Sequence, residues 1–110
     1  MNKIVNIKSG KHYDLYIGRA NKTYNVEQSI FFNPFIIGVH GNRTEVIEKF
    51  RQYALTSREL MNNLYLTDNK ILGCWCSWPF EDCHGRVLFE LREQQKQDKV
   101  DNRLKSMWDL

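Results

Sequence analysis

The 110-residue chain lacks any long apolar run and contains only three cysteines, an odd number. No segment approaches the roughly 18 apolar residues of a membrane span, so we expect no membrane segment. The N-terminus also lacks the apolar stretch of a signal peptide. Three cysteines cannot all pair within one chain, which indicates a reducing, cytoplasmic environment.

A strong excess of either charge is also missing. The net charge is +3, from 16 basic and 13 acidic residues mixed along the chain. This mixture does not favour a nucleic-acid partner, since such proteins usually concentrate positive charge in a patch. Hydrophobic residues make up 42% and charged residues 26%, a balance typical of one globular domain. A chain of this composition needs neither a metal nor a disulfide to fold.

The order of apolar segments predicts an α/β domain over residues 1–95, with a small mixed sheet and three helices, followed by a helical extension over 96–110. Strands are expected at Lys3–Ile7, Tyr13–Gly18 and Lys70–Trp75, the first two forming a hairpin.

Helices are expected at Arg43–Leu55, at Ser57–Tyr65, and from about Cys83 to Gln95. Asn42 with Glu45 predicts the start of the first of these helices, because such a pair satisfies free N–H groups. Thr56 with Glu59 repeats this capping pattern before the second helix.

All three cysteines lie in Gly73–Gly85, "GCWCSWPFEDCHG". In one interpretation this segment binds zinc, because Cys74, Cys76, Cys83 and His84 are ligands of the right kind. Side chains alternate along a strand, so Cys74 and Cys76 would share one face. In a second interpretation these cysteines are buried packing residues, since cysteine often behaves as a small hydrophobe. Cys74 in particular is expected in the core.

A third interpretation places a ligand pocket where the last strand ends and the last helix begins. Cys83 would lie at a helix N-terminus, which favours thiolate, with His84 beside it for acid–base work. These two are the candidate catalytic residues, and Gly85 would let a ligand approach the backbone. Free N–H groups at a helix start favour an anion such as a phosphate.

Other candidate ligand-binding residues lie outside this segment. Arg19 follows the second predicted strand in "YIGR", where an arginine can meet an anion. Asn33 belongs to "NPF", a turn in which Pro34 restricts the backbone. Arg43 opens the first predicted helix, near its N–H groups. Each of the three has a structural alternative as a surface or turn residue.

These motifs in this order, "YIGR", "NPF", "GNR", "CWC" and "CHG", resemble a small domain family of unknown function found in bacteria, phages and other viruses. The resemblance covers about Ile4–Leu91. It implies a compact α/β domain, with the motifs clustered around a pocket, and supplies no established reaction. For a viral protein, the expected location is the host cytoplasm or the virion.

Two functions from different classes therefore stand. The first is a domain that binds, and in an enzyme would process, a nucleotide-like or phosphosugar anion through the pocket residues. The second is a structural or interaction module, with zinc as its only candidate cofactor, that docks a partner or a second copy through its C-terminal helix. Val100, Leu104 and Trp108 recur at helical spacing there, a common docking pattern.

Overall fold

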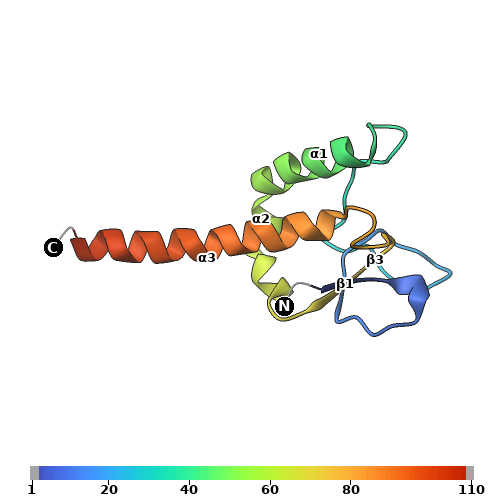
Figure 1. Cartoon of the computed structure of the whole chain (residues 1–110), viewed down its shortest axis with the longest axis horizontal. Coiled ribbons are helices and arrows are strands. Elements are labelled where there is room, and N and C mark those ends of the chain that lie inside the picture. The colour runs from blue at the N-terminus through green and yellow to red at the C-terminus, as the bar shows by residue number, and fades with distance from the viewer. Residues whose placement is uncertain (1–2, 109–110) are drawn as a thin grey trace.

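The computed structural model describes residues 3–108, with side chains described as far as Leu104. A compact α/β domain carries one long helix that projects from it (Figure 1). The predicted fold class is confirmed. In chain order the elements are β1 (Lys3–Asn6), η1 (Ile7–Ser9), β2 (Leu15–Tyr16), α1 (Arg43–Thr56), α2 (Arg58–Asn62), η2 (Leu64–Thr67), β3 (Ile71–Cys74) and α3 (His84–Trp108).

The sheet has the strand order β1-β3-β2, and both pairings are parallel. The predicted hairpin and the mixed strand directions are therefore wrong. β3 carries the sequence "ILGC" and is buried over its last three residues, so it takes the centre of the sheet with a partner on each side. The short η1 turns the chain away from β1, with Asn6 as its cap, and β2 joins the far edge.

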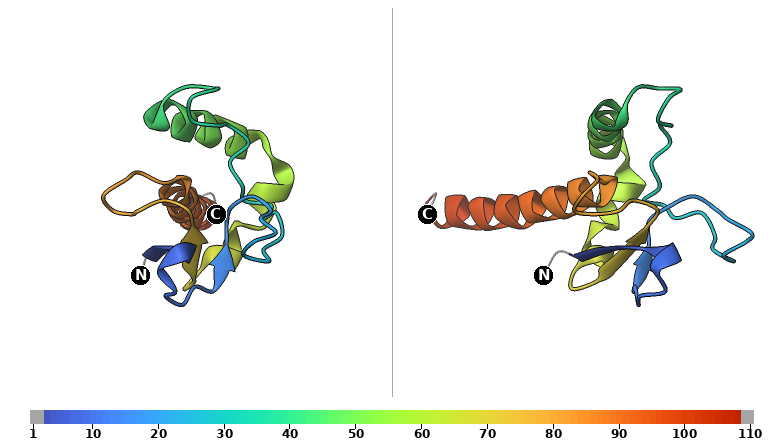
Figure 2. Two further views of the ribbon diagram at one scale, coloured as in Figure 1. Left: turned by 90° about the vertical axis from the view of Figure 1, so that its right-hand side faces the viewer. Right: turned by 45° about the vertical axis from the view of Figure 1, so that its right-hand side comes forward.

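The cap of α1 is the one that the sequence predicts. The Asn42 side chain accepts from the Glu45 backbone N–H, and the Glu45 side chain accepts from the Asn42 backbone N–H. The buried face of the helix carries Val46, Ile47 and Phe50. This face packs on the first half of α3, which lies between α1 and the sheet (Figure 2).

The predicted helix over Ser57–Tyr65 is split into α2 and η2. Its cap is Ser57 rather than Thr56, since the Ser57 hydroxyl accepts from the Leu60 backbone N–H. Leu60 and Leu64 are buried as the apolar spacing predicts.

α3 is one continuous helix of 25 residues. Val87, Leu88 and Leu91 are buried in the core, and Gln95 donates to the Met61 carbonyl at 2.8 Å. Every described side chain beyond it, from residue 96 to residue 104, is exposed. Among residues 3–108 no helix combines the length and the apolar character that crossing a membrane requires.

Candidate functional site

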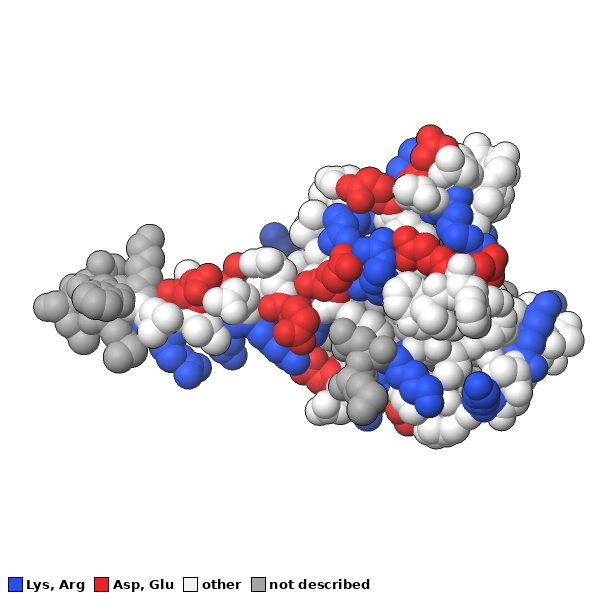
Figure 3. Space-filling model, in the orientation of Figure 1, with Lys and Arg blue, Asp and Glu red and all other residues white. Residues whose placement is uncertain are grey.

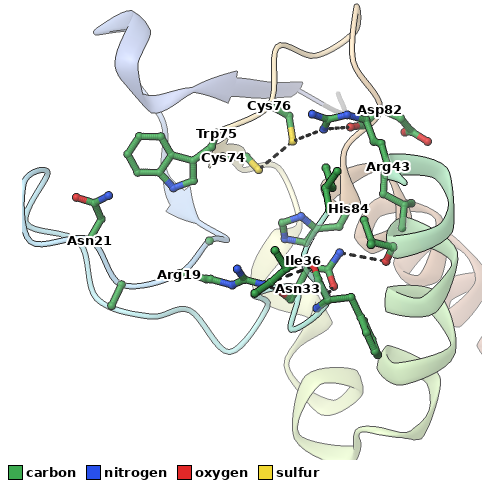
Figure 4. A pocket seen from close by; sticks show the side chains of 16 residues that line it. Arg19, Asn21, Asn33, Ile36, Arg43, Cys74, Trp75, Cys76, Asp82 and His84 are labelled. Atoms are coloured by element: carbon green, nitrogen blue, oxygen red, sulfur yellow. Dashed lines mark hydrogen bonds between the residues drawn. The ribbon is translucent and has the colours of Figure 1, made fainter. Parts of the chain in front are cut away.

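A cavity of about 490 Å³ opens at the carboxyl ends of β2 and β3. Three stretches of chain line it: the loop after β2, the turn that leads into α1, and the segment between β3 and α3 (Figure 4). The carboxyl edge of parallel strands is where open α/β sheets bind ligands, because loops diverge there and helix starts converge. The predicted site residues on its wall are Arg19, Asn33, Arg43, Cys74, Cys76 and His84.

Arg19 is held firmly in the cavity wall. Its Nη2 donates to the carbonyls of Asn33 and Phe35 at 2.6 and 3.4 Å. Within the described residues, this guanidinium forms no ion pair with a carboxylate, so its charge is not neutralised locally. Arg19 is therefore a fixed cation available to a ligand.

The "YIGR" motif explains how Arg19 is positioned. The Tyr16 hydroxyl donates to the Arg19 carbonyl at 2.5 Å and accepts from the indole N–H of Trp75 at 2.7 Å. Gly18 leaves room for this arrangement, because a Cβ there would overlap the Tyr16 hydroxyl. Tyr16 and Trp75 are site residues that the sequence did not predict, although they lie in the motifs "YIGR" and "CWC".

Asn33 uses its side chain to shape the turn. The amide Nδ2 donates to the Val46 carbonyl at 3.2 Å, and Oδ1 accepts from the Phe35 backbone N–H at 2.9 Å. The Asn33 carbonyl in turn accepts from Arg19. Asn33 thus joins α1, the turn and Arg19 into one wall of the cavity.

Arg43 ties the start of α1 to the segment before α3. Its Nη1 donates to the Asp82 carbonyl at 3.0 Å and to the Cys76 sulfur at 3.4 Å. Its Nη2 pairs with the Glu81 carboxylate at 3.0 Å. Unlike Arg19, Arg43 already has a carboxylate partner.

The three cysteines come together beside the cavity, and Figure 4 shows the two that line it, Cys74 and Cys76. Their sulfur atoms all lie within 4.8 Å of one another, with 3.7 Å between Cys74 and Cys76 and 3.4 Å between Cys83 and Cys74. Cys74 belongs to the core, as the sequence predicts, and Cys83 is also buried. Cys76 is half-buried and points toward the other two sulfurs.

These contacts shift the pKa values of the three thiols in different directions. Hydrogen bonds from Cys74 and Cys83, with help from Arg43, lower the pKa of Cys76 far below its usual value. The contact with Cys76 raises the pKa of Cys74 to about 11. The contact with Cys74 raises the pKa of Cys83 as well. Cys76, beside Arg43, is therefore the thiol of the cluster that loses its proton most readily, while Cys83 donates to Cys74 and Cys74 donates to Cys76.

His84 does not join the sulfur cluster among the described residues. Its Nε2 donates to the Ile17 carbonyl at 2.8 Å, and its ring packs edge-on against Phe50 at 4.9 Å. Burial lowers the pKa of this histidine, and the Ile17 carbonyl opposes that shift. The structure thus assembles three of the four predicted metal ligands. The catalytic roles of Cys83 and His84 stay predictions.

Gly85 lies behind the cavity rather than on its wall. A Cβ at this position would lie 2.9 Å from Ile4 Cδ1 and 3.0 Å from Ile17 Cδ1. The glycine therefore lets the start of α3 approach the sheet closely. Its backbone N–H donates to the Cys83 sulfur at 3.4 Å, so Cys83 caps the helix.

The opposite charges on the molecular surface are interspersed. Figure 3 shows Lys and Arg beside Asp and Glu along α3 and over α1. Many of these charges pair with each other, including Arg51 with Glu90 and Arg92 with Asp68. The face seen in Figure 3 has the mixed charge that the composition predicts.

Fold and site together define a small α/β domain with a three-stranded parallel sheet and a cavity at its carboxyl edge. The chain belongs to the family described as "Domain of unknown function (DUF4326)", whose model matches residues 5–94. "Uncharacterized protein R718" of Acanthamoeba polyphaga mimivirus is 34% identical over 101 residues, which cover 80% of this chain and 77% of that protein. No solved structure matches. A family of unknown function with a viral relative is thus confirmed.

Proposed function

We propose that the domain binds a small phosphate-bearing anion, nucleotide-like or phosphosugar in class, in the cavity at the carboxyl edge of the sheet. The observation that carries this proposal is Arg19, a partly buried guanidinium with no carboxylate partner among the described residues. Guanidinium groups bind phosphate through charge-assisted hydrogen bonds. Arg19 already has a fixed orientation, so a ligand would spend little of its binding energy on ordering this side chain.

The cavity also offers apolar contacts for the rest of such a ligand. Trp75 lines it from the end of β3, and the exposed side chains of Ile36 and Ile37 line it from the turn before α1. Its volume of about 490 Å³ lies within the range of about 300–1,000 Å³ typical of small-molecule pockets. One charged wall and one apolar wall suit a molecule that joins a phosphate to a ring.

The test is binding of nucleoside mono- and diphosphates and sugar phosphates to the whole chain, measured by thermal shift and then by calorimetry. Arg19→Gln should weaken binding of the selected ligand about 10- to 150-fold, because a hydrogen bond to a charged group contributes about 1.5–3 kcal/mol. Arg58→Gln is the matched control, since this exposed arginine on α2 lies outside the cavity lining and the substitution removes the same charge. Failure of every compound at millimolar concentration, or equal weakening by both substitutions, would contradict the proposal.

A second candidate function is docking through α3. The observation that favours it is the projection of this helix from the domain, with Val100 and Leu104 exposed four residues apart (Figure 1). The side chain of Trp108, the third predicted docking residue, lies outside the described side chains. A chain ending at Lys96 should lose self-association or a captured partner. An unchanged mass in light scattering together with an unchanged set of partners would refute this candidate.

A further inference from the structure

We infer that Cys74, Cys76 and Cys83 form a binding site for one thiophilic divalent ion, zinc in the first place, and that the fourth coordination position of this ion faces the cavity. The inference goes beyond the proposed function, because an anion could bind at Arg19 without any metal. It also differs from the four-ligand site that the sequence predicts, since His84 has no part in it.

The spacing of the sulfur atoms suits such an ion. Zinc–sulfur bonds of about 2.3 Å in tetrahedral geometry place neighbouring sulfurs about 3.8 Å apart. The observed separations are 3.7 Å for Cys74 and Cys76 and 3.4 Å for Cys83 and Cys74. The third separation is at most 4.8 Å. Ordinary rotamer adjustments would bring all three sulfurs to metal-binding distances.

The chain builds this cluster from two rigid elements. Cys74 ends β3, and Cys76 follows two residues later with its side chain on the same side. Cys83 comes from the cap of α3, nine residues after Cys74. Metal sites are most precise when their ligands sit on regular elements or on their ends, as two of these do.

Donors outside the cluster already orient two of the sulfurs. Arg43 Nη1 lies 3.4 Å from the Cys76 sulfur, and the Gly85 backbone N–H donates to the Cys83 sulfur at 3.4 Å. Such outer contacts stabilise thiolates and hold them in place for a metal. Apolar packing explains a buried cysteine such as Cys74. It does not explain why the half-buried Cys76 directs its sulfur toward the other two and toward a guanidinium.

The side of the cluster that faces the cavity has no fourth protein ligand among the described residues. Cys74 and Cys76 line the cavity, whereas Cys83 lies behind them. The nearby His84 uses Nε2 to bond the Ile17 carbonyl. Structural zinc sites are usually closed by four protein ligands, whereas zinc sites that bind exchangeable molecules keep one position open. The present arrangement is of the second kind.

The test uses Co²⁺ as a spectroscopic probe, added without oxygen to the metal-free whole chain in the presence of a phosphine reductant. We expect about one equivalent of Co²⁺ to bind, with thiolate-to-metal absorption and the intense visible bands of tetrahedral cobalt, and zinc should displace it. Cys76→Ser should weaken Co²⁺ binding more than 10-fold and reduce the thiolate absorption. Arg43→Gln should weaken it about 10- to 100-fold, the usual effect of losing an outer contact.

Two further measurements test whether His84 is a ligand and whether the fourth coordination position is open. His84→Gln, checked for folding by circular dichroism, should leave the cobalt spectrum unchanged, and a spectrum that loses intensity would restore the four-ligand site. Added imidazole should shift the visible bands of the wild-type complex, since an open position accepts a new ligand. Unshifted bands would overturn the open position.

The absence of thiolate-to-cobalt absorption, or a Cys76→Ser chain that binds as the wild type does, would overturn the site as a whole. Arg19→Gln distinguishes this inference from the proposed function. It should weaken binding of a phosphate compound while leaving the cobalt spectrum unchanged.

Discussion

Replacing Gly85 by alanine tests the packing that positions the whole site. The added Cβ would lie 2.9 Å from Ile4 Cδ1 and 3.0 Å from Ile17 Cδ1, both closer than ordinary van der Waals contact. Ile4 and Ile17 are buried in the close-packed core, so their tips have little room to withdraw. The start of α3 would therefore have to shift away from the sheet, together with the Cys83 cap.

Two effects of opposite sign decide the change in stability. Overpacking a core costs about 1–3 kcal/mol. Alanine in place of glycine inside a helix gains about 0.8–1.0 kcal/mol, and less in the first turn, where Gly85 lies. The net expectation is a loss of about 1 kcal/mol in the free energy of unfolding. For a domain of this size, that corresponds to a Tm lowered by about 4–8 °C.

Urea and thermal unfolding of four chains would measure this effect: the wild type, Gly85→Ala, Ile4→Val and the double variant. Ile4→Val removes the closest methyl group and alone costs about 0.5–1.5 kcal/mol. Because it also makes room for the new Cβ, the double variant should be more stable than additivity predicts by at least about 0.5 kcal/mol. A Gly85→Ala chain as stable as the wild type, or strictly additive losses, would refute the packing argument.

Three further predictions follow from other contacts. Asn42→Ala should lower the free energy of unfolding by about 1 kcal/mol, because the α1 cap is lost. Asn42→Gly should lower it by only a few tenths of a kcal/mol. Equal losses for the two variants in urea unfolding would contradict this role of the cap. Hydrogen bonds from Arg92 lower the pKa of Asp68 in the folded state. The pair therefore stabilises the fold at pH values above the ordinary aspartate pKa of about 3.9. This stabilisation is lost as the pH falls through the lower pKa of the folded state. Unfolding measured from pH 6 to pH 2 should therefore show a smaller acid-induced loss for Arg92→Gln than for the wild type, and parallel profiles would exclude this role. A chain ending at Lys96 should keep the Tm of the whole chain, because every described side chain from residue 97 to residue 104 is exposed. A lowered Tm would show that this segment packs on the domain.

The sequence predicts most of the helices because their signals are local. The Asn42 cap and the apolar spacing of Val46, Ile47 and Phe50 are written within one segment, and they place the start of α1 at the observed residue. The same holds for the buried stripe of α3. Strand pairing is not local, so the hairpin expected from the sequence is wrong: the two N-terminal strands are adjacent in sequence but are separated in space by β3.

The sequence predicts which residues lie at the candidate site better than it predicts how their side chains are arranged. Strand alternation correctly placed Cys74 and Cys76 on one side, and the position after β2 marked Arg19. No pattern in the sequence shows that His84 turns to the Ile17 carbonyl, because that bond joins residues 67 positions apart. The role of Gly85 was also beyond prediction, since it depends on which residues of the sheet lie opposite the helix.

α3 is a continuous helix that connects the cavity to the far end of the molecule. The helix begins beside the sulfur cluster and runs for 25 residues without a break, which at 1.5 Å per residue is about 37 Å. Such a helix acts as a lever arm: a tilt of about 5° in its first turn displaces its tip by about 3 Å. The two functions proposed above, ligand binding at one end and docking at the other, are therefore compatible, because a rigid helix can carry a change at its start to its tip.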